Sequence, residues 1–153
     1  MKKKFISMCS LILVFLLPAC TTLLTPVPQQ TTPVAQVPTP EYVPEGAVQD
    51  AILVDSDVFI QDIVTGISTN DYTTFAKDFD AVMSNSLKET EFGQVYDSFG
   101  PLGVSEKIEL YNVQVAGDYY AVRYKVTYPK KIIIIRVVVD KNDPRKVSGL
   151  WFE

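Results

Sequence analysis

The stretch that decides the fold is YYAVRYKVTYPKKIIIIRVVVD, residues 119–140. From Tyr120 to Tyr128 every second residue is valine or tyrosine, which is the pattern of a strand with one buried face. After a turn, Ile132–Asp140 is apolar and β-branched except for Arg136. On an exposed edge such a segment would template aggregation, so it predicts a central strand that is covered on its faces.

Two further strands are expected beside this pair. Lys107–Ala116 alternates in the same way and leads into the turn Gly117-Asp118. Lys146–Phe152 follows the turn Asn142-Asp143-Pro144 and closes the domain. Together these segments predict a curved four-stranded antiparallel meander.

The preceding half of the domain predicts about three helices. Apolar residues recur at spacings of three and four from Val48 to Ile67, which indicates a long amphipathic helix. An alternative is a shorter helix capped by Ser56 and Asp57. Asp71 is expected to cap a short helix through Lys77.

A third helix is expected over Glu89–Phe99, where Gly100-Pro101 provides a stop. The predicted class is therefore α+β, with the helices packed on one face of the sheet over residues 47–153. The opposite face of the sheet is available to a second copy of the chain, so a homodimer through that face is a possible assembly.

Three segments carry a resemblance to a known group of domains. They are the Asn70-Asp71-Tyr72 turn, Phe99-Gly100-Pro101-Leu102-Gly103, and Val147-Ser148-Gly149-Leu150-Trp151-Phe152. In this order they resemble the small secreted domains of unknown function in the nuclear-transport-factor-two-like (cystatin-like fold) superfamily. The resemblance implies a cone-shaped fold with a pocket between helices and sheet, used for ligand binding, dimerisation or sometimes catalysis. It transfers no catalytic residue.

The first nineteen residues have the features of an export signal. Lys2, Lys3 and Lys4 precede the apolar run Phe5–Leu17. At about 13 residues, this run suits a signal peptide and is shorter than the ~20 residues of a membrane-spanning helix. Residues 1–19 are therefore expected to be removed.

Leu17-Pro18-Ala19-Cys20 resembles the bacterial lipobox, although Pro18 departs from the usual residue at that position. The resemblance implies cleavage between Ala19 and Cys20 and attachment of lipid to Cys20. The mature protein is then expected to be anchored to the cell membrane or the outer membrane, with its domain outside the cytoplasm. Residues 20–46 carry prolines at high density and predict a disordered, extended stalk.

The amino-acid composition excludes several chemistries. The chain has two cysteines and no histidine. Cys9 would leave with the signal and Cys20 would carry lipid, so no disulfide or thiol nucleophile remains. Without histidine there is no Ser-His-Asp or Cys-His catalysis and no imidazole metal site. We expect no cofactor and no metal.

Charge differs between the two halves of the domain. Residues 47–103 hold ten acidic and two basic residues, whereas residues 104–153 hold six acidic and nine basic ones. A net acidic, exported protein is a poor nucleic-acid ligand, so no nucleic acid is expected as a partner.

The basic residues of the strands form one candidate site. A loop of two or four residues between the two central strands would place Arg123, Lys125 and Arg136 on the same face as near neighbours. They would then bind a carboxylate or a phosphate. The competing interpretation is a sheet face exposed to water, where the positive charges are balanced by Asp140 or Glu109.

Carboxylates offer an enzymatic alternative. Asp57 and Asp62 are spaced along one helix, and Asp78 and Asp80 lie near a helix end. A buried aspartate beside Tyr96 or Tyr111 would act as a general base on an acidic ketone. A catalytic aspartate should be enclosed, whereas a solvated one should be open. The aromatic residues Tyr120, Tyr124, Trp151 and Phe152 favour a core or an interface over a platform that stacks sugars.

The function favoured by these patterns is a lipid-anchored binding or envelope accessory module without catalysis. The alternative is a small-molecule enzyme of the isomerase or dehydratase type that uses a pocket aspartate and tyrosine.

Overall fold

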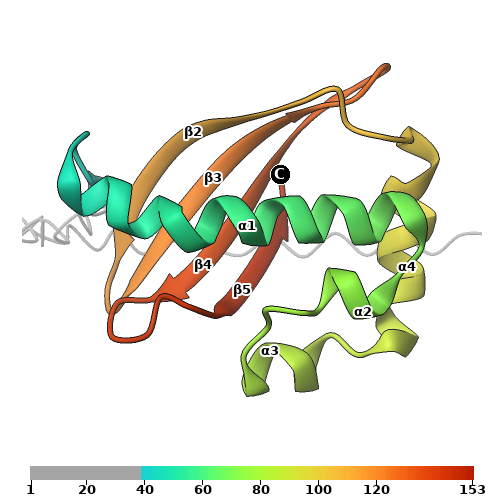
Figure 1. The fold of residues 1–153 in the computed structure, drawn as a ribbon, viewed down its shortest axis with the longest axis horizontal. Coiled ribbons are helices and arrows are strands. Elements are labelled where there is room, and N and C mark those ends of the chain that lie inside the picture. Colours follow the sequence, from blue (N-terminus) through green and yellow to red (C-terminus); the bar gives the residue numbers. More distant parts are fainter. Residues whose placement is uncertain (1–38) are drawn as a thin grey trace, which may run out of the picture. The chain divides into compact units, whose positions relative to one another are not determined.

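A computed structural model of the chain describes residues 39–153 (Figure 1). In this part the helices lie on one side of a single antiparallel sheet, which confirms the α+β class. The elements in chain order are β1 (Glu41–Tyr42), α1 (Ala47–Thr69), α2 (Tyr72–Phe75), α3 (Ala81–Ser86), α4 (Glu89–Phe99), the 3₁₀ turn η1 (Gly100–Leu102), β2 (Lys107–Ala116), β3 (Tyr119–Thr127), β4 (Ile132–Asp140) and β5 (Val147–Phe152).

The strands form a meander in the order β1-β2-β3-β4-β5. Strand β4, with its run of isoleucine and valine, pairs with β3 on one side and with β5 on the other, so it is an interior strand as predicted. Thr127 pairs with Ile132 across the β3–β4 turn, which leaves a loop of residues 128–131. This even loop length keeps the alternating apolar positions of both strands on the helix side. On that side Val122 and Ile135 are fully buried.

The sheet has one strand more than predicted. Tyr42 of β1 pairs with Gln114 of β2, and the backbone N–H of Val43 donates to the carbonyl of Val113 at 2.9 Å. Val43 is buried in the core. The segment expected to be stalk therefore adds an edge strand to the sheet. A strand this short beside Pro44 has no alternation from which to predict it.

The helical layer also differs from the prediction of about three helices. Helix α1 runs without a break from Ala47 to Thr69, so the shorter alternative is wrong. The Ser56 hydroxyl donates to the carbonyl of Ile52 at 2.9 Å inside this helix and caps nothing. The described residues contain an additional short helix, α3, whose N-cap is Asp80. Helix α4 has the predicted bounds, and the chain after it tightens into η1.

Helices α1 and α2 meet at a tight turn. Asn70 ends α1 in the left-handed conformation with φ of 54°, and Asp71 caps α2 by accepting from the N–H groups of Thr73 and Thr74. Both residues were in the turn predicted from the sequence. An aromatic cluster then ties the helices together, with ring centroids of Phe75 and Phe92 4.7 Å apart. The other members of this cluster are Tyr72 and Phe79.

The domain contains its own core. The buried apolar cluster draws its members from Val43, which follows β1, from the helices, and from β2 to β5. Stacking of Phe99 on Phe152, with centroids 4.3 Å apart, joins the end of α4 to β5. None of the helices between residues 39 and 153 has the length and apolar character needed to cross a bilayer. The predicted signal peptide, the cleavage position Ala19, the lipidated Cys20 and most of the predicted stalk lie outside the described residues.

Candidate functional site

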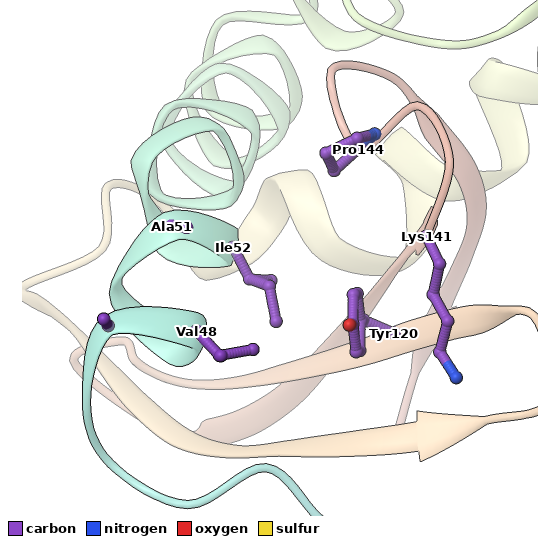
Figure 2. Close-up of a pocket in the computed structure, with 7 residues that line it drawn as sticks. Val48, Ala51, Ile52, Tyr120, Lys141 and Pro144 are labelled. Atoms are coloured by element: carbon purple, nitrogen blue, oxygen red, sulfur yellow. The ribbon is translucent and has the colours of Figure 1, made fainter.

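A pocket of about 370 Å³ opens between the start of α1 and one end of the sheet (Figure 2). Its helical wall is formed by successive turns of α1, its floor by β3, and its far side by the loop between β4 and β5. The lining residues are Ala47, Val48, Ala51, Ile52, Tyr120, Lys141 and Pro144.

The walls of this pocket are apolar and only partly covered. Val48 is 60% exposed, although Ile52, one turn further along α1, is 4% exposed and belongs to the core. Figure 2 shows both side chains directed toward the hollow, opposite the ring of Tyr120. Because Val48 and Ile52 are four residues apart, they lie on the same face of the helix. The pocket is thus an open end of the core that contacts solvent.

Lys141 supplies the positive charge of this pocket. Its Nζ donates to the carbonyl of Gly117 at 2.6 Å and lies 5.3 Å from the centroid of the Tyr120 ring. The hydrogen bond and the aromatic face hold the ammonium group at the side of the hollow. An apolar hollow beside one fixed cation suits a small molecule with an apolar body and a negative end.

The resemblance implied a pocket between helices and sheet, but sequence reasoning did not identify the residues that line this one. Tyr120 was assigned to core or interface, Pro144 was part of a turn, and Lys141 was given no role. The lining comes from three segments that are distant along the chain, so no local pattern marks it. The available signal was the apolar Val48 at the start of α1, where a helix end usually meets solvent.

A second hollow of about 210 Å³ lies further along α1 and holds an aspartate and a tyrosine. The Tyr124 hydroxyl donates to Asp57 Oδ1 at 2.7 Å. Burial, and then the bond to Asp57, raise the pKa of Tyr124, so its proton stays in place. Asp57 itself is exposed, which does not meet the requirement that a catalytic aspartate be enclosed.

The tyrosines named from the sequence are placed differently. Tyr111 is 61% exposed, and its position coincides with the irregularity in the β2–β3 pairing. Tyr96 packs against the core. The aspartate–tyrosine contact is instead made by Tyr124, which was assigned from the sequence to a core or an interface. The alternating pattern predicts that the ring of Tyr124 is buried, but it does not predict where the hydroxyl group lies.

The remaining aspartates have structural contacts. Asp80 Oδ1 accepts from the backbone N–H of Met83 at 2.7 Å and caps α3. Asp62 Oδ2 pairs with Lys77 Nζ at 2.8 Å. Burial, followed by a hydrogen bond with Asp62, raises the pKa of Asp78. Within residues 39–153 no group of three or more acidic side chains is arranged to hold a metal ion.

The predicted basic cluster lies on the sheet face that points away from the helices. Arg123 pairs directly with Arg136 in the β3–β4 register, so the structure brings these two together. Lys125 is on the same face, but its Nζ pairs with Glu109 at 3.2 Å. Glu109 is thus one of the partners expected from the sequence, whereas Asp140 accepts from the N–H of Asn142.

Both arginines share a carboxylate that the sequence did not suggest. Glu153 Oε2 lies 3.2 Å from Arg123 Nε, and Glu153 Oε1 lies 3.2 Å from Arg136 Nη1. The place where an external anion was expected is therefore occupied by a side chain of the protein itself.

Comparison with known proteins gives one match. A family model described as "Protein of unknown function (DUF3887)" matches residues 61–150. The chain belongs to the DUF3887 family. The matched segment begins inside α1 and ends in β5, so the DUF3887 match includes the floor and far side of the larger pocket, at Tyr120, Lys141 and Pro144. The helical wall of that pocket precedes it. No curated protein and no solved structure matches the chain.

Proposed function

We propose that this DUF3887 protein is a lipid-anchored protein outside the cytoplasm, whose domain binds a small amphipathic anion in the larger pocket. The observation that carries the proposal is the uncovered apolar wall at Val48, next to the buried Ile52. Burial of such a wall is favourable by about 25 cal/mol per Å² of apolar surface removed from water. A ligand would gain this energy by completing the end of the core.

The size and the charge of the pocket define the ligand class. A volume of about 370 Å³ lies at the small end of the range of about 300–1,000 Å³ typical of ligand pockets. Lys141 favours a carboxylate, sulfonate or phosphate at one end of the ligand, and the face of Tyr120 favours an apolar chain or ring beside it. The proposed mode of action is binding, without catalysis.

The proposed anchoring rests on the N-terminal sequence. The basic start, the short apolar run and Leu17-Pro18-Ala19-Cys20 support export and lipid attachment at Cys20. Mass spectrometry of the mature protein tests this directly, because a diacylglycerol adduct on Cys20 is expected. A mature chain with residues 1–19 retained, or with unmodified Cys20, would remove the anchor from the proposal. The order of helices and meander supports the proposed nuclear-transport-factor-two-like fold.

Binding can be tested with a fluorescent probe of the proposed chemistry. Anilinonaphthalene sulfonate has fused aromatic rings and a sulfonate, and its fluorescence rises in apolar sites. We use residues 37–153, the unit that contains the whole described core. The expected result is saturable binding of the probe. Ala51→Trp should abolish this binding because the new ring fills the hollow, and Lys141→Met should weaken it because the positive charge is lost.

The matched control is Val54→Trp, which places the same bulky ring on α1 at a position that is 70% exposed and outside the pocket. This control should bind the probe as the unmodified domain does. Equal binding by the Ala51→Trp and Val54→Trp domains would contradict the assignment of the ligand to this pocket.

A second candidate function is catalysis at the smaller hollow, favoured by the 2.7 Å contact between Tyr124 and Asp57. In this role Asp57 would abstract a proton beside a carbonyl. The Tyr124 hydroxyl, whose one proton is donated to Asp57 in this structure, would turn and donate it to the developing oxyanion. The test is deuterium exchange at the α-carbon of a cyclic ketone, followed by NMR. Exchange that requires the domain and disappears in Asp57→Asn would support catalysis, and exchange at the solvent rate would reject it.

A further inference from the structure

The sheet face away from the helices holds a carboxylate between two guanidinium groups. Each oxygen of Glu153 contacts one arginine at 3.2 Å. The side chain of Arg123 is 16% exposed and that of Arg136 is 27% exposed, so both cations are largely withdrawn from water. Glu153 is 38% exposed and is the most accessible of the three.

Other contacts hold the two guanidinium groups in place independently of Glu153. Arg136 lies over the Trp151 ring, with its guanidinium carbon 4.5 Å from the ring centroid. Arg123 Nη1 donates to the side-chain oxygens of Asn112, at 3.5 Å, and Gln114. Donors fixed in this way keep their geometry when the anion between them is exchanged.

The position of Trp151 depends on a glycine beside it. A Cβ at residue 149 would lie 2.5 Å from Cζ3 of the Trp151 ring. The absence of a side chain at Gly149 therefore lets the indole lie along the sheet. Trp151 remains 46% exposed and offers an aromatic surface next to the arginines.

The cluster retains positive charge and donor capacity. Two guanidinium groups share one carboxylate, and among the described residues Arg136 Nε is buried without a hydrogen-bond partner. Each arginine gives Glu153 a single close contact instead of the paired N–H contacts that an arginine can make with a carboxylate. Glu153 therefore leaves part of the positive charge and some of the N–H donors of the two arginines without a partner.

Release of Glu153 requires movement of its side chain alone. Its backbone N–H donates to the carbonyl of Ile134 at 2.8 Å, and its carbonyl accepts from Ile134 N–H at 3.2 Å. The chain is thus held beside β4 while the exposed carboxylate rotates into solvent. Glu153 is 38% exposed, so its carboxylate is partly hydrated in the pair. The exchange has a small cost because the incoming carboxylate pairs with the two arginines again.

We propose that Arg123 and Arg136 form a binding site for the carboxylate of a small ligand, that the ligand displaces Glu153, and that an apolar group of the ligand lies against Trp151. The excess of guanidinium groups over carboxylates supplies the charge complementarity for this occupant. The site is separate from the apolar pocket beside α1 and does not depend on the function proposed for it.

Benzoate is the probe, because it joins a carboxylate to an aromatic ring, and the assay is calorimetric titration of the full chain. Glu153→Gln keeps the side-chain shape and removes the internal competitor, so we expect benzoate to bind about fivefold tighter than to the unmodified chain, the change that corresponds to the loss of a weak ion pair. Adding Arg136→Gln to Glu153→Gln should remove binding. The matched control is Glu109→Gln, a carboxylate on the same face that pairs with Lys107 and Lys125. It should leave affinity unchanged.

Several outcomes would overturn the proposal. They are absence of benzoate binding to Glu153→Gln, equal affinity in Glu153→Gln and Glu109→Gln, and retention of binding in the double variant. If Glu153→Gln raised the affinity for inorganic phosphate as much as the affinity for benzoate, the site would be a general anion site and not a carboxylate site. A doubling of mass by light scattering in place of binding would assign the face to a second copy of the chain. The Trp151 indole N–H resonance, which should shift with benzoate, provides a readout in Arg123→Gln if the Arg136 variant does not fold.

Discussion

The contact between α1 and α2 gives the sharpest prediction about the fold, because the same substitution should have opposite effects at two glycines. In Gly66→Ala, the new Cβ would lie 2.4 Å from the backbone nitrogen of Phe75 and 2.6 Å from its Cα. Backbone atoms cannot rotate away, so α2 must shift. Overpacking of this kind costs about 1–3 kcal/mol, while alanine gains about 1 kcal/mol over glycine inside a helix. We expect a net loss of about 1 kcal/mol.

Gly93 is the matched control in α4. Apart from its chain neighbours and the backbone of its own helix, nothing lies within 4 Å of the Cβ that would be added there, and the residue is exposed. Gly93→Ala should therefore gain about 0.5–1 kcal/mol from the reduced freedom of the unfolded chain. The two variants should differ by about 2 kcal/mol in free energy of unfolding.

Urea denaturation followed by circular dichroism measures this difference as a shift in midpoint at constant slope. Equal midpoints for Gly66→Ala and Gly93→Ala would refute the reasoning, since they would mean that α2 does not lie against Gly66 as described. A stabilised Gly66→Ala variant would have the same meaning.

Three further predictions concern stability. Ile135→Ala removes a fully buried side chain from β4 and should lower the free energy of unfolding by about 2–5 kcal/mol in urea denaturation; a loss below about 1 kcal/mol would contradict an interior position for β4. Asp80→Ala removes the cap of α3 and should lower it by about 1 kcal/mol, with Asp80→Asn restoring most of the loss. The pKa of Asp78 is raised in the folded protein, so the folded protein binds the proton of this carboxyl more tightly than the unfolded chain does. The free energy of unfolding should therefore fall as the pH rises from the unfolded pKa, about 3.9, through the folded pKa. Thermal unfolding between pH 3 and 7 should show a smaller fall in Asp78→Asn, and equal pH dependence of both proteins would reject this assignment.

The strands were predictable because their burial pattern is local. Alternation from Tyr120 to Tyr128 and the apolar run in β4 identified the two central strands, and an even loop between them placed Arg123 beside Arg136. The helix over residues 89–99 was equally well marked by its spacing and its glycine-proline stop. Strand β1 was missed because it has two residues and its pairing depends on β2, which is distant along the chain.

The role of Glu153 could not be predicted because it depends on an irregularity in the sheet. The β4–β5 pairing shifts by one residue between Val138 and Val139. Before the shift Val139 pairs with Val147, and after it Arg136 pairs with Trp151. A regular register would have placed Trp151 on the helix side, since a shift of one residue reverses the face of every side chain. The sequence contains no mark of this shift other than Gly149, which alone does not fix its position.

The lining of the larger pocket could not be predicted from the sequence for a related reason. Its walls belong to the start of α1, to β3 and to the β4–β5 loop, and only the packed fold brings them together. The aspartate before α2 was easier to interpret. Asp71 was identified as a cap from its place before a helix, and its contacts with Thr73 and Thr74 bear this out.

The most direct test of ligand binding in the larger pocket is methyl-resolved NMR of residues 37–153 titrated with octanoate, which has an apolar chain and one carboxylate. The expected result is a saturable shift of the Val48 and Ile52 methyl resonances and of the Tyr120 ring resonances, while the exposed methyl groups of Val82 on α3 stay unchanged. Unchanged Val48 and Ile52 resonances at saturating octanoate, or shifts confined to residues outside this pocket, would contradict it.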